Sequence, residues 1–198
     1  MDQHVKFPVD EQGRLRRRPL VADLVSKRGS ALIVTGLGSA TYDVAAAGDN
    51  DNNFYFWGGM GLTAMTGLGI AIAQPERRVV VMTGDGDMMM GIGSLATIAA
   101  AAPSNLAILV LDNERFGETG EQIGLSAGCT DMAQMAVGAG FQTTATLSSE
   151  EEIKALPDLL YQTPGPVFCV AKVAPGNDER VLPSTDGAYL TRRFRDAL

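Results

Sequence analysis

The amino-acid sequence predicts a doubly wound α/β domain, in which helices cover both faces of a mostly parallel sheet. Two observations predict this class. Short apolar runs alternate with longer helical stretches, and glycines and polar residues directly follow three of the apolar runs. The chain has 198 residues, of which 45% are hydrophobic, so it has the length of one domain and enough apolar side chains for a core.

Four apolar runs have the length and composition of strands that are buried on both faces. They lack the regular alternation of polar and apolar residues that marks a half-exposed antiparallel strand. These runs are residues 31–35, 78–82, 106–111 and 167–171.

Four longer segments are predicted to be crossover helices, namely residues 60–74, 88–102, 130–139 and 148–161. Pro75 and Pro103 mark the ends of the first two, because proline cannot continue a helix. Ser148 or Ser149 caps the last helix, and acidic residues follow in its first turn, where the helix dipole favours negative charge. Pro157 is expected to kink or shorten this helix.

We expect the domain to occupy residues 29–173, between an N-terminal arm (1–28) and a C-terminal extension (174–198). The arm contains three consecutive arginines, 16–18, and is interpreted as a solvated segment or as the start of a docking helix. No aromatic residues lie among these arginines and the net charge of the chain is −7, so we expect no binding to nucleic acid.

Composition excludes several kinds of site. The only histidine is His4, so neither a Ser-His-Asp triad nor a paired-histidine zinc site can form. Cys129 and Cys169 lack CxxC spacing, and we expect both to be buried and inert in a reducing, cytoplasmic setting. We expect neither a signal peptide nor a membrane-spanning helix, because no apolar run has the required form.

The candidate site follows the predicted strands, at the sheet edge where open α/β domains bind ligands. In Gly84-Asp85-Gly86, the glycines let a ligand approach the backbone, and the N-terminus of the next helix favours a phosphate. Asp85, and Asn113 after the next strand, offer the oxygen donors that Mg²⁺ prefers. Taken separately, a tight turn explains Gly84-Asp85-Gly86 better than a ligand site does, and a helix cap explains Asn113 better.

Together, these residues resemble the signature of thiamine-diphosphate enzymes. Asn113 follows Gly84-Asp85-Gly86 after 26 residues, and Gly58-Gly59-Met60-Gly61 precedes a helix rich in alanine and glycine. The likeness covers about residues 30 to 172. The chain looks most like the small subunit of two-subunit sulfopyruvate decarboxylases and the matching domain of phosphonopyruvate decarboxylases. This resemblance implies the thiamine-diphosphate-binding fold and the decarboxylation of a small 2-oxo acid by a carboxy-lyase.

The resemblance also implies roles for individual residues. The Mg²⁺ ligands are the side chains of Asp85 and Asn113 and the main-chain carbonyl of Arg115. Met60 is the bulky residue that wedges the cofactor into the bent form in which it can lose its C2 proton. The other residues implied to contact the cofactor are Thr35, Gly36, Gly59, Gly84, Gly86, Asp87 and Gly117.

A second subunit is implied as well. Enzymes of this class carry a separate pyrimidine-binding domain, whose glutamate activates the cofactor, and no copy of that motif is recognisable in this chain. We therefore expect a partner (alpha) subunit, an active site between the two chains, and an α2β2 or larger assembly. The partner is expected to cover apolar surface near Trp57 and the helix over residues 60–72.

Residues 118–122 depart from the pattern of similar decarboxylases, because Glu118 and Glu121 replace small residues. If they face the substrate, they repel a sulfonate or phosphonate, and otherwise they face solvent or a basic partner. Three alternatives remain open. They are an acetolactate-synthase-like carboligase, a non-catalytic regulatory subunit, and a dinucleotide site at Gly36-Leu37-Gly38, which lacks the third glycine of that motif.

Overall fold

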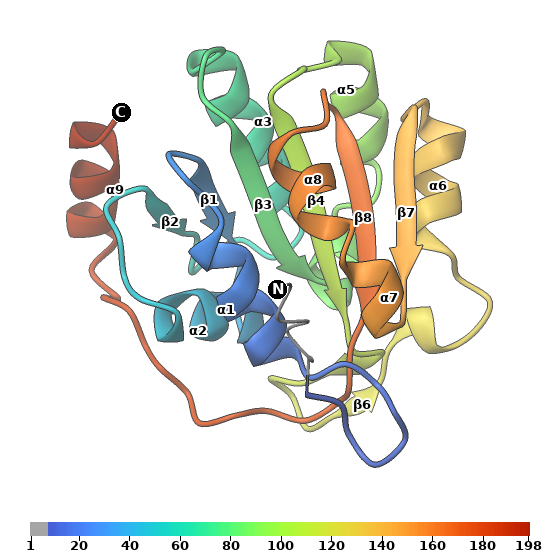
Figure 1. The fold of residues 1–198 in the computed structure, drawn as a ribbon. Helices are drawn as coiled ribbons and strands as arrows, with labels where there is room; N and C mark the ends of the chain where they lie inside the picture. Colours follow the sequence, from blue (N-terminus) through green and yellow to red (C-terminus); the bar gives the residue numbers. More distant parts are fainter. Residues whose placement is uncertain (1–7) are drawn as a thin grey trace, which may run out of the picture.

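The computed structural model describes residues 8–198 (Figure 1) and confirms the doubly wound α/β class. The main sheet has six strands in the order β2-β1-β3-β4-β8-β7, and every pair of neighbours is parallel. Its strands are β1 (Leu32–Thr35), β2 (Asn53–Tyr55), β3 (Val79–Gly84), β4 (Leu106–Asp112), β7 (Thr143–Leu147) and β8 (Val167–Lys172). A second, two-stranded hairpin joins β5 (Arg115–Phe116) to β6 (Gln122–Ile123).

The strand order places a switch point between β1 and β3. The chain passes from β1 to β2 on one side and then returns to build β3 and β4 on the other side. Ligands of open α/β sheets bind beyond the carboxyl ends of the strands at such a point. The loops that follow β1, β3 and β4 therefore surround the expected position of a ligand.

Helices cover both faces of the sheet, because successive side chains of each central strand point to opposite faces. Ile33 and Val80 pack with the helices α1 (Arg17–Ser26), α2 (Ser39–Ala46), α7 (Glu150–Ile153) and α8 (Leu156–Tyr161). Val34 and Val81 pack on the other face with α3 (Thr63–Ala73), α4 (Asp85–Met90), α5 (Ser94–Ala101) and α6 (Met132–Ala139). The apolar runs of the sequence thus mark strands that are buried on both faces.

Two strands and one helix break differ from the sequence prediction. β2 and β7 are the two edge strands, and they are short or rich in threonine, so neither forms a recognisable apolar run. The segment 88–102 is not one helix, because α4 ends at Met90 and α5 begins at Ser94. Gly91 lies in this break, where a Cβ atom would sit 1.9 Å from the carbonyl oxygen of Gly61.

The predicted helix over 148–161 is divided into α7 and α8. Ser149 caps α7 in a capping box with Glu152, as the residue types indicate. Pro157 lies in the first turn of α8, so it starts a new helix at the point where the first one has ended. The expected shortening at Pro157 is therefore observed.

The two terminal segments behave differently from one another. Within the segment 1–28, α1 packs into the core through Leu20, Val21 and Leu24, so this part of the expected arm is a docked helix. His4 lies outside the described residues. Residues 174–186, which we call the C-terminal strap, run past the carboxyl ends of the strands towards the β2 edge (Figure 1).

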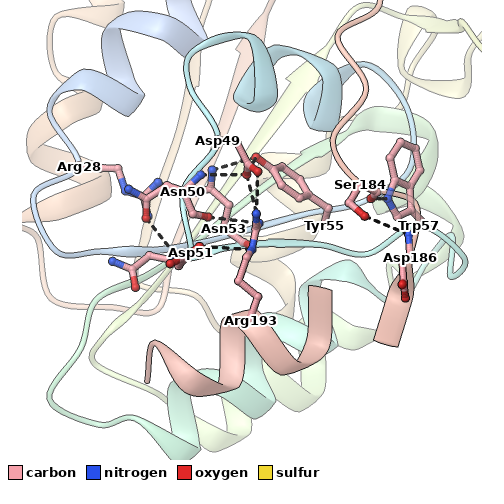
Figure 2. Close-up of polar contacts among 11 residues, drawn as sticks. Arg28, Asp49, Asn50, Asp51, Asn53, Tyr55, Trp57, Ser184, Asp186 and Arg193 are labelled. Atoms are coloured by element: carbon pink, nitrogen blue, oxygen red, sulfur yellow. Dashed lines mark hydrogen bonds and ion pairs between the residues drawn. The ribbon is translucent and has the colours of Figure 1, made fainter. Parts of the chain in front are cut away.

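The strap leads to a final helix, α9 (Gly187–Asp196), which covers the edge strand β2. Asp186 caps α9 by accepting a hydrogen bond from the backbone N–H of Tyr189. Arg193 of α9 forms an ion pair of 2.6 Å with Asp49 in the loop before β2 (Figure 2). Trp57 donates its indole N–H to the backbone carbonyl of Ser184 at 2.9 Å. These contacts fasten the strap at its far end.

The structure also tests two expectations that came from composition. Cys169 is buried in β8, and burial raises the pKa of its thiol to about 12. Cys129 is exposed, contrary to expectation, because it lies on a surface loop between Leu125–Ala127 and α6. No helix in the described part of the chain combines the length and apolar character that crossing a membrane requires.

Candidate functional site

One pocket lies at the carboxyl edge of the sheet and collects residues from the loops after β1, β3 and β4. It brings together eight of the residues predicted from the sequence: Met60, Gly84, Asp85, Gly86, Asp87, Asn113, Arg115 and Gly117. It is also lined by residues outside the predicted set of cofactor and metal contacts, including Arg17, Leu37, Gly38, Ser39, Phe116 and Glu118. Residues far apart in sequence thus share one cavity at the switch point.

Asp85 is the most electrostatically unusual group of the pocket. It begins α4 directly after β3, and only 3% of its surface is exposed. Burial, and then the nearby carboxylate of Asp112, raise the pKa of Asp85 to about 6. No lysine or arginine among residues 8–198 forms an ion pair with it. A buried carboxylate without a cationic partner is suited to bind a cation.

The nearby Lys172 forms ion pairs with carboxylates other than that of Asp85. Lys172 Nζ lies 2.7 Å from Asp112 and 2.8 Å from Glu114, and these two acids raise the pKa of Lys172 against the effect of its burial. Ser126 Oγ lies 2.7 Å from Asp112 Oδ1 and 3.1 Å from Asp85 Oδ2, so its hydroxyl proton is shared between the two acids. The negative charge of Asp112 is therefore balanced, whereas that of Asp85 is not.

Asn113 follows β4 and is nearly buried, with 8% of its surface exposed. Its side-chain oxygen accepts a hydrogen bond of 3.0 Å from the backbone N–H of Arg115, which shapes the turn between β4 and the hairpin. Glu114, at the centre of this turn, has a positive φ of 61°. An amide oxygen has a second lone pair, so this bond leaves Asn113 able to bind a further partner.

Asp87 connects two parts of the site. One carboxylate oxygen accepts the backbone N–H of Gly61, and the other accepts the hydroxyl of Thr83. The loop that carries Met60 is thereby attached to α4. The side chain of Met60 is 41% exposed and lines the pocket.

Three predicted residues do not line the pocket: Thr35, Gly36 and Gly59. The hydroxyl of Thr35 is fully buried and hydrogen-bonded to Thr41. A Cβ atom at Gly36 would sit 2.4 Å from Thr63 Oγ1, and one at Gly59 would sit 2.2 Å from the ring of Phe56. In this structure all three support the loops around the pocket.

Some residues of the pocket could be predicted from the sequence, and others could not. Gly38 and Ser39 follow a predicted strand at the start of α2, so their position in the chain already indicated a site. Arg17 gives no such signal, because it reaches the pocket only through the packing of α1 against α2. Its guanidinium Nε lies 2.5 Å from the fully buried carboxylate of Asp43.

Comparison with known proteins agrees with this geometry. Residues 37–171 match the family described as "Thiamine pyrophosphate enzyme, C-terminal TPP binding domain". The chain belongs to this thiamine pyrophosphate enzyme family. The matched region begins after β1 and ends in β8, so it contains the loops that supply Asp85, Asn113 and Met60.

Two named relatives of this thiamine pyrophosphate enzyme chain differ in how much of their length the chain covers. The sulfopyruvate decarboxylase subunit beta of Methanothermobacter thermautotrophicus is 35% identical over 82% of this chain and 84% of its own length. The phosphonopyruvate decarboxylase of Streptomyces viridochromogenes is 36% identical over 83% of this chain, but only 41% of that protein is covered. The chain therefore spans most of a beta subunit and less than half of the longer relative.

Among solved structures, a putative thiamin diphosphate-dependent enzyme from Mycobacterium smegmatis has a similar fold. The TM-score is 0.65 and the identity 21%, over 81% of this chain and 32% of that one. At this identity the likeness concerns the fold.

Proposed function

We propose that this chain is the cofactor-binding subunit of a 2-oxo acid decarboxylase that uses thiamine diphosphate and Mg²⁺. The observation that carries the proposal is the single pocket that holds Asp85, Asn113 and Met60 at the switch point of the sheet. Membership of the thiamine pyrophosphate enzyme family, and relatives named as decarboxylases, support the same conclusion.

The residues of the pocket fit Mg²⁺. We propose the side chains of Asp85 and Asn113 and the main-chain carbonyl of Arg115 as its ligands. Asp85 is a buried carboxylate that lacks a cationic partner among residues 8–198, and all three donors are oxygens. No group of three or more His, Cys, Asp or Glu side chains in the described chain could hold a metal. A magnesium ion here would thus depend on phosphate oxygens for the rest of its shell.

The glycines of the pocket fit a diphosphate. Gly84 and Gly86 flank Asp85, and a Cβ atom at Gly86 would sit 3.2 Å from the ring of Phe116. Gly117 presents a further stretch of backbone without a side chain. We propose that these glycines and Asp87 surround the diphosphate, while Thr35 and Gly36 support it from behind.

Met60 and Gly59 lie on the loop that we assign to the pyrimidine end of the cofactor. When bound, thiamine diphosphate supplies the carbanion that attacks the 2-oxo group and the electron sink that makes loss of CO₂ possible. We assign to Met60 the role of holding the cofactor in its bent shape. Asp87 positions the loop that carries Met60 through its hydrogen bond with Gly61.

We propose that a pyrimidine-domain alpha subunit completes the site and supplies the activating glutamate, in an α2β2 or larger assembly. Exposed apolar side chains gather around the loop of Met60, namely Met60, Leu62 and Met90, with 41%, 53% and 66% of their surface exposed. An apolar face of this kind marks a protein contact. Relatives named as beta subunits support a two-subunit enzyme.

We also propose a reducing, cytoplasmic setting, in line with the two unpaired thiols of Cys129 and Cys169.

Calorimetry and a decarboxylation assay test this function. We expect Mg²⁺-dependent binding of thiamine diphosphate by the chain together with its partner, and CO₂ release from 2-oxo acids only when both subunits are present. Asp85→Ala and Asn113→Ala should each abolish Mg²⁺-dependent binding with the fold retained. Normal binding by both variants would contradict the metal assignment, and full turnover by the isolated chain would contradict the two-subunit site.

Carboligation is the second candidate. The large subunit of acetolactate synthase isozyme 1 from Escherichia coli is 29% identical over 64% of this chain. The two reactions share the loss of CO₂ and differ in the product, so product analysis in the same assay separates them. An aldehyde product supports the decarboxylase, and a 2-hydroxy ketone or acetohydroxy acid supports the carboligase.

A further inference from the structure

The two carboxylates that depart from the family pattern take different positions. Glu118 lines the pocket together with Asp85, Asn113 and Met60. Glu121 does not line it and instead accepts a hydrogen bond of 2.9 Å from the side chain of Asn177 in the C-terminal strap. This loop therefore adds one negative charge to the pocket wall rather than two.

The carboxylate of Glu118 is held from outside the pocket. Arg180 Nη2, in the strap, lies 3.1 Å from Glu118 Oε2, and the hydroxyl of Tyr42 lies 3.5 Å from the same oxygen. The guanidinium of Arg180 also lies 5.6 Å from the centre of the Tyr42 ring. The side chain of Glu118 is 30% exposed and that of Arg180 is 54% exposed, so Arg180 balances the charge of Glu118 only partly.

Glu118 also lies where the fold would otherwise attract an anion. A Cβ atom at Gly38 would sit 3.3 Å from Glu118 Oε1, so this carboxylate lies against the N-terminus of α2. That helix end carries a partial positive charge and has no side-chain cap. An anionic group of a ligand at this position would meet the carboxylate instead of the free helix end.

The two arginines that line the pocket differ in whether they are already paired. Arg17 is already paired with the buried Asp43. The guanidinium of Arg115 forms no ion pair with any residue in the range 8–198. Within residues 8–198 the guanidinium of Arg115 is therefore available to an anionic group of a ligand, such as the carboxylate that every 2-oxo acid carries.

We propose that Glu118 is a specificity-determining residue that selects 2-oxo acids with an uncharged side chain against those that carry a sulfonate or phosphonate. The inference rests on the proposed function and names the substrate class of the same site. Arg180 is the positioning residue, because it holds the carboxylate of Glu118 and moderates its charge.

The test compares substrates within each enzyme preparation. The chain, its partner subunit, thiamine diphosphate and Mg²⁺ are assayed for CO₂ release from pyruvate, sulfopyruvate and phosphonopyruvate. For Glu118→Gln we expect the kcat/KM ratio of sulfopyruvate to pyruvate to rise about fivefold or more, because one charge repulsion is removed. Glutamine keeps the acceptor for Arg180. The ratio for phosphonopyruvate should rise further, because a phosphonate carries more negative charge.

Glu121→Gln is the matched control, because it changes the same residue type in the same loop outside the pocket and keeps the acceptor for Asn177. The kcat/KM ratio of sulfopyruvate to pyruvate for Glu121→Gln should equal that of the wild type. Arg180→Gln should lower the sulfopyruvate ratio, and Arg180→Lys should restore it towards the wild-type value. Both kcat/KM values of a ratio are measured on the same preparation. A loss of folded protein lowers both values by the same factor and therefore leaves the ratio unchanged.

The outcomes separate the two proposals. If Glu118→Gln changes kcat/KM by one common factor for all three acids, or if Glu121→Gln shifts the ratio equally, the specificity inference is wrong and the decarboxylase stands. If the wild-type complex releases CO₂ from none of the acids, the proposed function fails and the inference fails with it.

Discussion

The carboxylate of Asp87 accepts a hydrogen bond from the backbone N–H of Gly61, a residue 26 positions earlier in the chain. Asp87 lies in α4, two residues after Asp85, and Gly61 follows Met60. This bond therefore holds the proposed wedge at a set place relative to the proposed metal ligand. Bound groups lose reactivity steeply when their alignment is lost, so this link between two loops bears directly on function.

Replacing Met60 by alanine tests the wedge. We expect slower hydrogen–deuterium exchange at C2 of bound thiamine diphosphate, by on the order of 100-fold, because a misplacement of about 1 Å costs that much. Cofactor affinity should fall much less. Met135→Ala is the control, since Met135 of α6 is as exposed as Met60 but does not line the pocket. An unchanged exchange rate in Met60→Ala would show that Met60 serves packing alone.

A pair of glycine substitutions tests the contact between the Met60 loop and the break between α4 and α5. A Cβ atom at Gly91 would sit 1.9 Å from the carbonyl oxygen of Gly61, whereas one at Gly93 would meet nothing within 4 Å. Gly91→Ala should lower the free energy of unfolding by about 1–3 kcal/mol and weaken cofactor binding, because the two backbones must separate. Gly93→Ala should leave both quantities unchanged within error. Urea unfolding and calorimetry measure them, and equal effects of the two variants would contradict the proposed close packing.

Asp85 should make the stability of the metal-free protein depend on pH. Its folded pKa of about 6 lies above the unfolded value of about 3.9, so the folded state binds this proton more tightly. The stabilisation associated with it is complete below about pH 4 and is lost as the pH rises through 6. Asp85→Asn abolishes this titration. In urea unfolding with a chelator, the variant should match the wild type near pH 4 and exceed it above pH 6, and parallel curves would contradict the assignment.

The buried ion pair of Arg17 and Asp43 should stabilise the docking of α1. Asp43 is fully buried and also accepts a hydrogen bond of 2.9 Å from Arg18. Asp43→Asn leaves a buried guanidinium without its counterion, and we expect a loss of about 3–5 kcal/mol in the free energy of unfolding. Asp178→Asn removes an exposed partner of Arg16 and should cost less than about 1 kcal/mol. A loss of similar size in both variants would show that burial of the Asp43 pair is not decisive.

Much of this protein could be predicted from local sequence. The central strands appear as uninterrupted apolar runs because both of their faces are buried, and the loops after β3 and β4 carry Asp85 and Asn113 at the sheet edge where ligands bind. The capping box at Ser149 and the new helix at Pro157 follow from single residues and their neighbours. The edge strands β2 and β7 were missed, because an edge strand need not be apolar.

Only the tertiary structure decided the features that depend on contacts distant in sequence. Arg17 joins the pocket because α1 packs on α2, and the break after α4 follows from the close approach of Gly91 to Gly61. The sequence left the orientation of Glu118 and Glu121 open, since both lie in one short loop. The strap separates them, with Asn177 binding Glu121 and Arg180 binding Glu118. Residue type and position determined the chemistry available to the site, whereas long-range packing determined which groups face the pocket.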